Sequence, residues 1–137
     1  MSLEQLSTYV RVKVSFFASC KVEVYELESC VRGHHVYGRV WRATVDEQSE
    51  CKPEPRNQDL YAVAVLKNDA VVGHVPRKIS AACTMFIRKR GTINCVVKGR
   101  RRYSSDLPQG GLEIPCVYRM ARQFQTGVKN RDRWSVN

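Results

Sequence analysis

The polar residues that most clearly suggest a binding function lie where an expected strand is followed by an expected helix. The stretch VVGHVPRKIS (71–80) places His74 just before Pro76, and the cations Arg77 and Lys78 follow in the first helical turn. That turn offers unpaired N–H groups and the positive end of the helix dipole, and both favour an anion. Acidic residues usually occupy it, so two cations there indicate a phosphate site. The alternative is that His74 is satisfied by backbone groups and the cations are simply solvated.

Charge is distributed unevenly along the 137 residues. Residues 1–60 carry 8 Lys and Arg against 9 Asp and Glu, whereas residues 61–137 carry 15 against 4. The net charge of +10 therefore arises in the C-terminal part. Such an excess is typical of proteins that bind a polyanion, most often a nucleic acid or an anionic membrane surface. A basic face that serves only solubility is the alternative.

Further basic and aromatic residues fit a nucleic-acid partner. A second basic run lies in an expected loop and comprises Arg100, Arg101 and Arg102. The aromatic rings on which single-stranded bases could stack are those of Tyr37, Trp41 and Tyr61. Small β-domains also bury such rings, so a place in the core is the alternative for each of them.

Several classes of function are not expected from this sequence. The six cysteines form no CxxC motif, and Cys30 beside His34 and His35 is a single cluster without a second ligand pair, so we expect no metal. A P-loop and a Gly-rich phosphate cradle are both missing, so we expect neither an enzyme nor a cofactor. The N-terminal residues do not resemble a signal peptide, and no apolar run would span a bilayer. We therefore expect an intracellular protein with reduced thiols, not a secreted or membrane protein.

The hydrophobic patterns predict short strands around one helix. An apolar stripe on the predicted helix is formed by Ile79, Ala82, Cys83, Phe86 and Ile87. Pro115 indicates an edge position or a bulge for the last strand. The predicted strands are 9–17, 21–27, 36–45, 60–66, 71–75, 92–99 and 112–120, with a hairpin turn at 67–70, a helix at 77–90 and loops at 46–59 and 100–111. The expected fold is therefore mostly β with one main α-helix, arranged as a small barrel whose open side the helix covers.

Four segments in this order resemble a HIRAN domain: VRGHHVYGRVW, PEPRNQDLYAVAV, VVGHVPRKIS and GLEIPCVY. This family occurs at the N-terminus of some Swi/Snf-type helicase-like ATPases that remodel replication forks, and also as short stand-alone proteins. The resemblance covers residues 31–120, which leaves an N-terminal β extension at 1–30 and a basic, flexible tail at 121–137. It implies a small OB-like modified β-barrel that binds single-stranded DNA and captures its free 3′ end. It also implies a role in DNA repair in the nucleus.

The resemblance assigns roles to individual residues. Tyr37 matches an aromatic residue that stacks on a terminal base, and His35 lies where the family often has a basic residue. The residues that match those reaching the terminal sugar and phosphate are Asn57, Asp59, His74 and Arg77, and Lys78, Arg100, Arg101 and Arg102 form a secondary basic patch. Asp59 would accept a hydrogen bond from a free 3′-hydroxyl, and its charge would repel a phosphate in that place.

Two functions remain open at this stage. The first is a nucleic-acid-binding module whose partner is the 3′ end of single-stranded DNA, with a helicase-like ATPase acting in trans. The second is a protein-interaction module that keeps the barrel but has lost DNA binding. Val36 and Gln58 motivate the second reading, because they stand where the family has aromatic residues.

Overall fold

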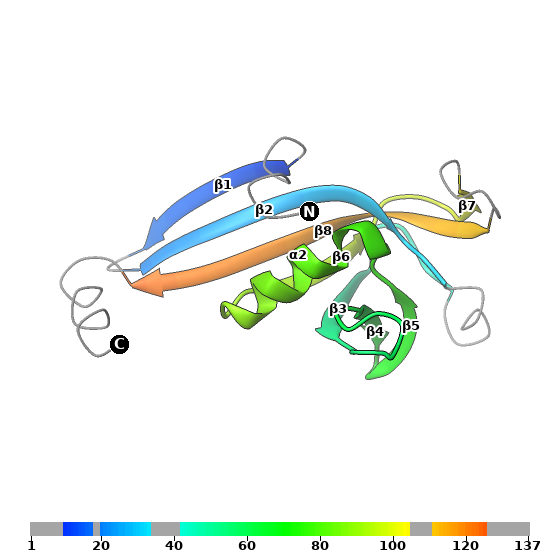
Figure 1. Cartoon of the computed structure of the whole chain (residues 1–137). Coiled ribbons are helices and arrows are strands. Elements are labelled where there is room, and N and C mark those ends of the chain that lie inside the picture. The colour runs from blue at the N-terminus through cyan, green and yellow to red at the C-terminus, as the bar shows by residue number, and fades with distance from the viewer. Residues whose placement is uncertain (1–9, 18–19, 34–41, 105–110, 126–137) are drawn as a thin grey trace.

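The computed structural model describes residues 10–17, 20–33, 42–104 and 111–125. The elements in this part of the chain are β1 (Val10–Phe17), β2 (Cys20–Val31), β3 (Gln48–Pro53), β4 (Val63–Lys67), β5 (Ala70–His74), α2 (Arg77–Arg88), β6 (Thr92–Val97), β7 (Arg102–Tyr103) and β8 (Leu112–Gln125). The predicted class, mostly β with one helix, is confirmed. In Figure 1, α2 lies between the long strands β2 and β8 and the short strands β3, β4 and β5.

All strands belong to one antiparallel sheet with the order β1-β2-β8-β6-β3-β4-β5, and β7 pairs with β8 beside this path. Strand pairing does not close the sheet into a barrel. One isolated bridge nevertheless joins the chain after β2 to the end of β5, where the N–H groups of Arg32 and His74 each donate to the other's carbonyl at 2.8 Å. The two distant arms of the curved sheet therefore meet at His74.

The helix packs through the stripe that the sequence predicts. Ile79, Ala82, Cys83 and Phe86 are all buried, and the large side chains of Ile79 and Phe86 each contribute up to about 1.5–3 kcal/mol by leaving water. The helix ends in a Schellman motif, in which Gly91 donates its N–H to the carbonyl of Phe86 at 3.0 Å. A Cβ on Gly91 would lie 2.2 Å from the Phe86 ring, so this turn needs glycine because of packing.

The long strands reach α2 through Phe86. The Tyr25 ring of β2 meets the Phe86 ring edge-on at 5.9 Å between centroids, and the Arg122 guanidinium of β8 lies 5.5 Å from the same centroid. Glu23 holds these two neighbours in place, because its Oε2 accepts hydrogen bonds from Tyr25 Oη and Arg122 Nη2, each at 3.0 Å. Lys21 Nζ lies 3.0 Å from the other carboxylate oxygen.

The hairpin of β4 and β5 is confirmed, and its turn explains how it forms without glycine. Asn68 and Asp69 take φ values of 51° and 65°. Positive φ at both central residues is the type I′ pattern, whose twist matches that of the flanking strands. Asn and Asp tolerate this conformation better than other non-glycine residues do.

The predicted loop at 46–59 is wrong for its first half, because β3 lies there between β4 and β6. Ser49 and Cys51 face inward and are buried, while Gln48, Glu50 and Lys52 are exposed. The inward residues are small and only weakly apolar, so the alternation carries little hydrophobic signal. The predicted strand at 36–45 has no strand in its described part, residues 42–45, and its other residues lie outside the described chain.

The last strand differs from its prediction in place and in length. β8 pairs with β2 on one side and with β6 and β7 on the other, so it is not an edge strand. Pro115 is tolerated because it faces the interruption between β6 and β7, where its carbonyl accepts from Lys98 N–H at 2.9 Å and no donor is needed. The strand also continues to Gln125, five residues beyond its predicted end, because its pairing with β2 continues that far.

Thiol reactivity should report this packing. Cys20 is half-buried, whereas the other five cysteines are buried. Burial raises the pKa of Cys30 and of Cys83 to about 12 and lifts those of Cys51 and Cys116 further still. Since the thiolate is the reactive form, iodoacetamide at neutral pH should modify the native protein rapidly at Cys20 alone. Mass spectrometry should count one adduct before and six after denaturation, and rapid native labelling of Cys83 would contradict this packing.

Acid should weaken the contact between the long strands and the helix. Burial raises the pKa of Glu23, but hydrogen bonds from Arg122, Lys21 and Tyr25 outweigh it and hold the pKa below its ordinary value of 4.5. A lowered pKa stabilises the fold above the unfolded-state value and ceases to do so as the pH falls through the folded value. Glu23→Gln should therefore lower the unfolding free energy at neutral pH by about 1 kcal/mol or more and have no effect in strong acid.

Urea unfolding at both pH values measures this difference, with Glu28→Gln on the exposed face of β2 as the control. An equal loss in Glu23→Gln at neutral and at acid pH would contradict the electrostatic explanation.

Candidate nucleic-acid interface

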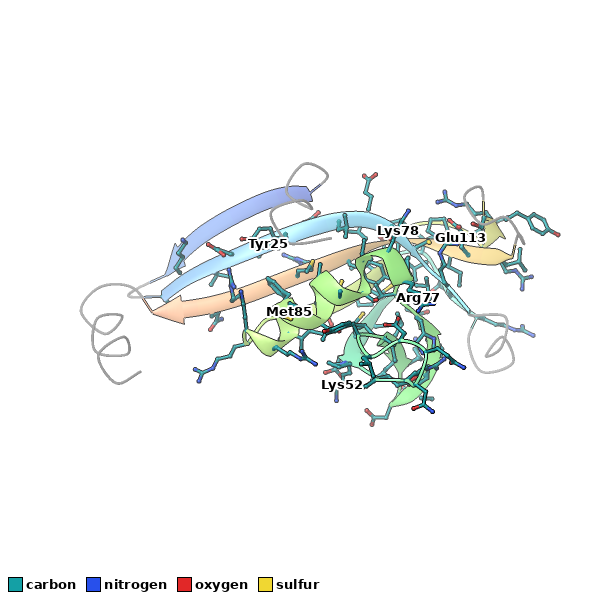
Figure 2. All side chains as sticks on the ribbon, viewed as in Figure 1. Tyr25, Lys52, Arg77, Lys78, Met85 and Glu113 are labelled. Atoms are coloured by element: carbon teal, nitrogen blue, oxygen red, sulfur yellow. The ribbon has the colours of Figure 1, made fainter. Side chains whose placement is uncertain are left out.

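The start of α2 has the features of an anion site. Pro76 occupies the N-cap position, makes no side-chain cap hydrogen bond, and is followed by a first turn that contains no acidic residue. The first intrahelical contact runs from Ile79 N–H to the Pro76 carbonyl at 3.0 Å, so the preceding amides have no intrahelical acceptor. Arg77 and Lys78 are both exposed, and Figure 2 shows them at this end of the helix.

The first turns of α2 hold the segment that precedes β4. Arg77 donates from Nη2 to the Gln58 carbonyl at 2.7 Å. Ser80 lies 3.5 Å from Asp59 Oδ2, but its hydroxyl is closer, at 3.0 Å, to the Arg77 carbonyl. Gln58 therefore contributes its backbone carbonyl to this contact. The segment that contains it lies against the first turn of α2.

The same face of α2 continues the contact two turns further on. Thr84 Oγ1 donates to the Tyr61 carbonyl at 2.8 Å, and the Arg88 guanidinium lies 5.6 Å from the centre of the Tyr61 ring. The contacting residues at 77, 80, 84 and 88 recur at helical spacing, so one helix face binds residues 58–61.

Asp59 organises the turn that precedes this segment. Its backbone N–H and carbonyl pair with those of Arg56, which closes a turn over residues 56–59. Its Oδ1 accepts the Tyr61 N–H at 3.0 Å, a local bond typical of aspartate in turns. Asp59 is half-buried, and Asn57 at the tip of the turn is exposed.

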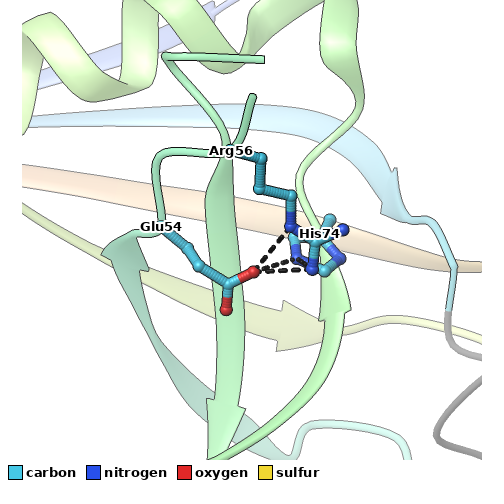
Figure 3. Close-up of polar contacts among 3 residues, drawn as sticks. All are labelled: Glu54, Arg56 and His74. Carbon is cyan, nitrogen blue, oxygen red and sulfur yellow. Dashed lines mark hydrogen bonds and ion pairs between the residues drawn. The ribbon is translucent and has the colours of Figure 1, made fainter. Parts of the chain in front are cut away.

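His74 is part of a polar cluster with Glu54 and Arg56 (Figure 3). Its Nε2 lies 3.0 Å from Glu54 Oε1 and 2.7 Å from Arg56 Nη2, donating to the first or accepting from the second according to its tautomer. Arg56 also donates to Glu54 Oε1 from Nε at 2.8 Å and from Nη2 at 2.6 Å. Burial raises the pKa of Glu54, but the hydrogen bonds from His74 and Arg56 outweigh it, so the pKa is lowered.

A buried carboxylate links this region to the second basic run. Glu113 is buried and lies 3.5 Å from Arg32 and 3.1 Å from Arg102. Because Arg32 also forms the bridge to His74, the Arg102 end of the run is anchored near the bridge. Arg100 and Arg101 are exposed.

The structure brings together some of the predicted site residues. Asp59 and Arg77 lie on segments in direct contact, Asn57 is on the adjoining turn, and His74 ends the strand that leads to the helix. His35, Val36, Tyr37 and Trp41 lie outside the described residues. Arg100 and Arg101 lie just before β7 and Arg102 lies in it, while Lys78 follows Arg77 in the first turn of α2.

Comparisons with protein-family models, with curated proteins and with solved structures return no match for this chain. Among the described residues, no helix is long and apolar enough to cross a membrane.

Sequence reasoning missed three residues of this surface, namely Glu54, Arg56 and Arg88. Glu54 and Arg56 were read only as part of a loop, although a Glu and an Arg two positions apart can pair across a turn. Tyr61, predicted as a candidate stacking ring with a core position as the alternative, is 42% exposed, and the sequence pattern assigns Arg88 no role beyond its place in the predicted helix. Only the tertiary contact between residues 58–61 and α2 brings Tyr61 and Arg88 together.

Removing the Glu54 charge should make this surface bind polyanions more tightly. Its carboxylate offsets the charge of Arg56, and opposite charges about 4 Å apart in water interact by about 1 kcal/mol. Glu54→Gln should therefore strengthen the binding of a heparin probe about fivefold at low salt. Glu50→Gln, which removes an equal charge from exposed β3, is the matched control in a fluorescence titration. Equal affinities of the two variants would show that Glu54 does not govern this surface.

Proposed function

We propose that this chain is a nucleic-acid-binding module that binds single-stranded DNA at the start of α2. One observation carries the proposal: an uncapped, acid-free helix N-terminus with exposed Arg77 and Lys78 lies against the 56–59 turn, which presents Asn57 and Asp59. Helix amides, a guanidinium and an ammonium together form a typical phosphate site. The basic charge of residues 61–137 would add long-range attraction.

The resemblance to a HIRAN domain extends this proposal to the free 3′ end of the strand. Asp59 Oδ1 is engaged by the Tyr61 N–H, whereas Oδ2 has only the long contact with Ser80. Asp59 Oδ2 would therefore accept a hydrogen bond from a terminal 3′-hydroxyl, while Arg77, Lys78 and the helix amides hold the adjacent phosphate. A phosphate in place of the hydroxyl would face the carboxylate and be repelled.

The proposal gives His74 a positioning role beside the phosphate site. Its ring nitrogen is engaged by Glu54 and Arg56, and its backbone forms the bridge to Arg32. His74 would thus fix Arg56 and the 56–59 turn relative to the helix. The same resemblance suggests DNA repair in the nucleus, with a helicase-like ATPase acting in trans.

A protein-interaction module is the second candidate. Leu60 and Met85 are 66% and 43% exposed on the surface formed by residues 58–61 and α2. Exposed apolar side chains beside an arginine also suit a protein partner. A purified partner that binds with fixed stoichiometry after nuclease treatment, and that loses affinity when Leu60 is changed to Ser, would favour this candidate.

End discrimination tests the role of Asp59. The wild type should bind a short oligothymidine with a 3′-hydroxyl more tightly than the same strand with a 3′-phosphate. Asp59→Asn keeps an oxygen for the Tyr61 N–H but removes the charge, so the preference for the hydroxyl should shrink. Fluorescence anisotropy with both strands measures this, and an unchanged preference in Asp59→Asn would exclude end capture by Asp59.

The salt dependence of binding tests the role of Arg77. Arg77→Ala should weaken both strands about equally and reduce the slope of log affinity against log salt by about one unit. Arg77→Lys should retain the slope. Arg119→Ala, which removes an exposed charge from β8, is the matched control and should have a smaller effect. If wild-type affinity does not fall with salt, the phosphate site does not exist.

A further inference from the structure

We propose that Tyr61 and Arg88 form a base-stacking subsite for a nucleotide on the 5′ side of the one held at the start of α2. This inference rests on the proposed function and adds a second contact to it. The neighbouring groups that define the subsite are Tyr61, which precedes β4, and Thr84, Met85 and Arg88 on α2.

The Tyr61 ring is presented by a fixed backbone. The Tyr61 N–H donates to Asp59 Oδ1 at 3.0 Å, and its carbonyl accepts from Thr84 Oγ1 at 2.8 Å. Neither hydrogen bond involves the phenol side chain, so both can form whether or not a base stacks on the ring. A ring held in this way loses little conformational entropy when a base stacks on it.

Apolar exposure concentrates around this ring. Of the five large hydrophobic residues exposed within the described chain, three lie here: Leu60 at 66%, Tyr61 at 42% and Met85 at 43%. Arg88 joins them, because its guanidinium lies over the Tyr61 ring and its Nη1 is 4.0 Å from Met85 Sδ. An aromatic ring beside an arginine is a surface on which a base of any sequence can stack.

The charge of α2 favours a nucleic acid over a protein partner. Residues 77–90 contain no acidic residue and carry cations at both ends, Arg77 and Lys78 at the start and Arg88, Lys89 and Arg90 at the finish. Arg88 lies eleven positions after Arg77 along the helix, a distance of ~16 Å. A single strand laid along this face would meet a phosphate site at one end and a stacking ring with further cations toward the other.

Binding of oligothymidine and of an abasic strand of equal length tests the subsite. The abasic strand carries the same phosphates without bases. Tyr61→Ala should weaken oligothymidine binding by about 5- to 150-fold, the range expected for one stacked base. It should leave the abasic strand unaffected, and Tyr61→Phe should behave as the wild type on both.

A second pair of variants separates stacking from charge. Arg88→Gln and Lys89→Gln remove equal charges from neighbouring exposed positions, but only Arg88 lies over the ring. Arg88→Gln should lose more affinity for oligothymidine than Lys89→Gln does, and the two should lose equal affinity for the abasic strand. Thermal unfolding of each variant checks that the fold is retained.

The outcomes distinguish this inference from the proposed function. If the wild type binds oligothymidine and Tyr61→Ala binds it equally well, or loses equal affinity for both strands, the stacking subsite is overturned and the phosphate site stands. If the wild type binds neither strand, the proposed function is overturned and the subsite with it, which leaves the exposed surface to a protein partner.

Discussion

The packing of the apolar stripe of α2 into the curved sheet is the contact on which the rest of this structure depends. Phe86 lies at its centre, buried between Tyr25 and Arg122 of the long strands and the cysteine-rich interior beneath the helix. Once Ile79, Cys83 and Phe86 face inward, the helical period of 3.6 residues fixes the direction in which every other position of α2 faces. Arg77, Thr84 and Arg88 must then face residues 58–61, so the candidate surface is a consequence of how the core packs.

The bridge between Arg32 and His74 is the second constraint, and it acts on the backbone. Two reciprocal hydrogen bonds of 2.8 Å join parts of the sheet that are separated by five strand pairings along the path from β2 to β5. They fix the end of β5 at His74, and α2 begins only three residues later at Arg77. The direction in which the first helical amides point is thereby coupled to the curvature of the whole sheet.

Among the described residues, some of the cations near the junction of β5 and α2 are paired with carboxylates, whereas others are not. Glu54 pairs with Arg56 and His74. Glu113 pairs with Arg32 and Arg102, so a nearby carboxylate offsets the positive charge of these arginines. Arg77 donates to a backbone carbonyl and keeps its full charge. The net field at the helix start is therefore set by which cations have carboxylate partners, a property that counts of charged residues do not reveal.

The sequence by itself determined the elements whose signals are local. The helix from Arg77, its buried stripe and the β4–β5 hairpin follow from periodicity and turn chemistry within a few residues, and the structure confirms them. The basic half of the chain and the cations at the helix start were also readable, because charge is a property of residue type.

Only the tertiary structure decided which strands are central and what surrounds the site. The sequence did not predict β3, because its inward residues Ser49 and Cys51 are only weakly apolar. Pro115 suggested an edge strand, because the gap between β6 and β7 that accommodates it is set by two other strands. The pairing of His74 with Glu54 and of Tyr61 with Arg88 joins residues that are 20 and 27 positions apart. Such contacts depend on how the sheet curves, and curvature results from all the strand pairings together, which no local pattern encodes.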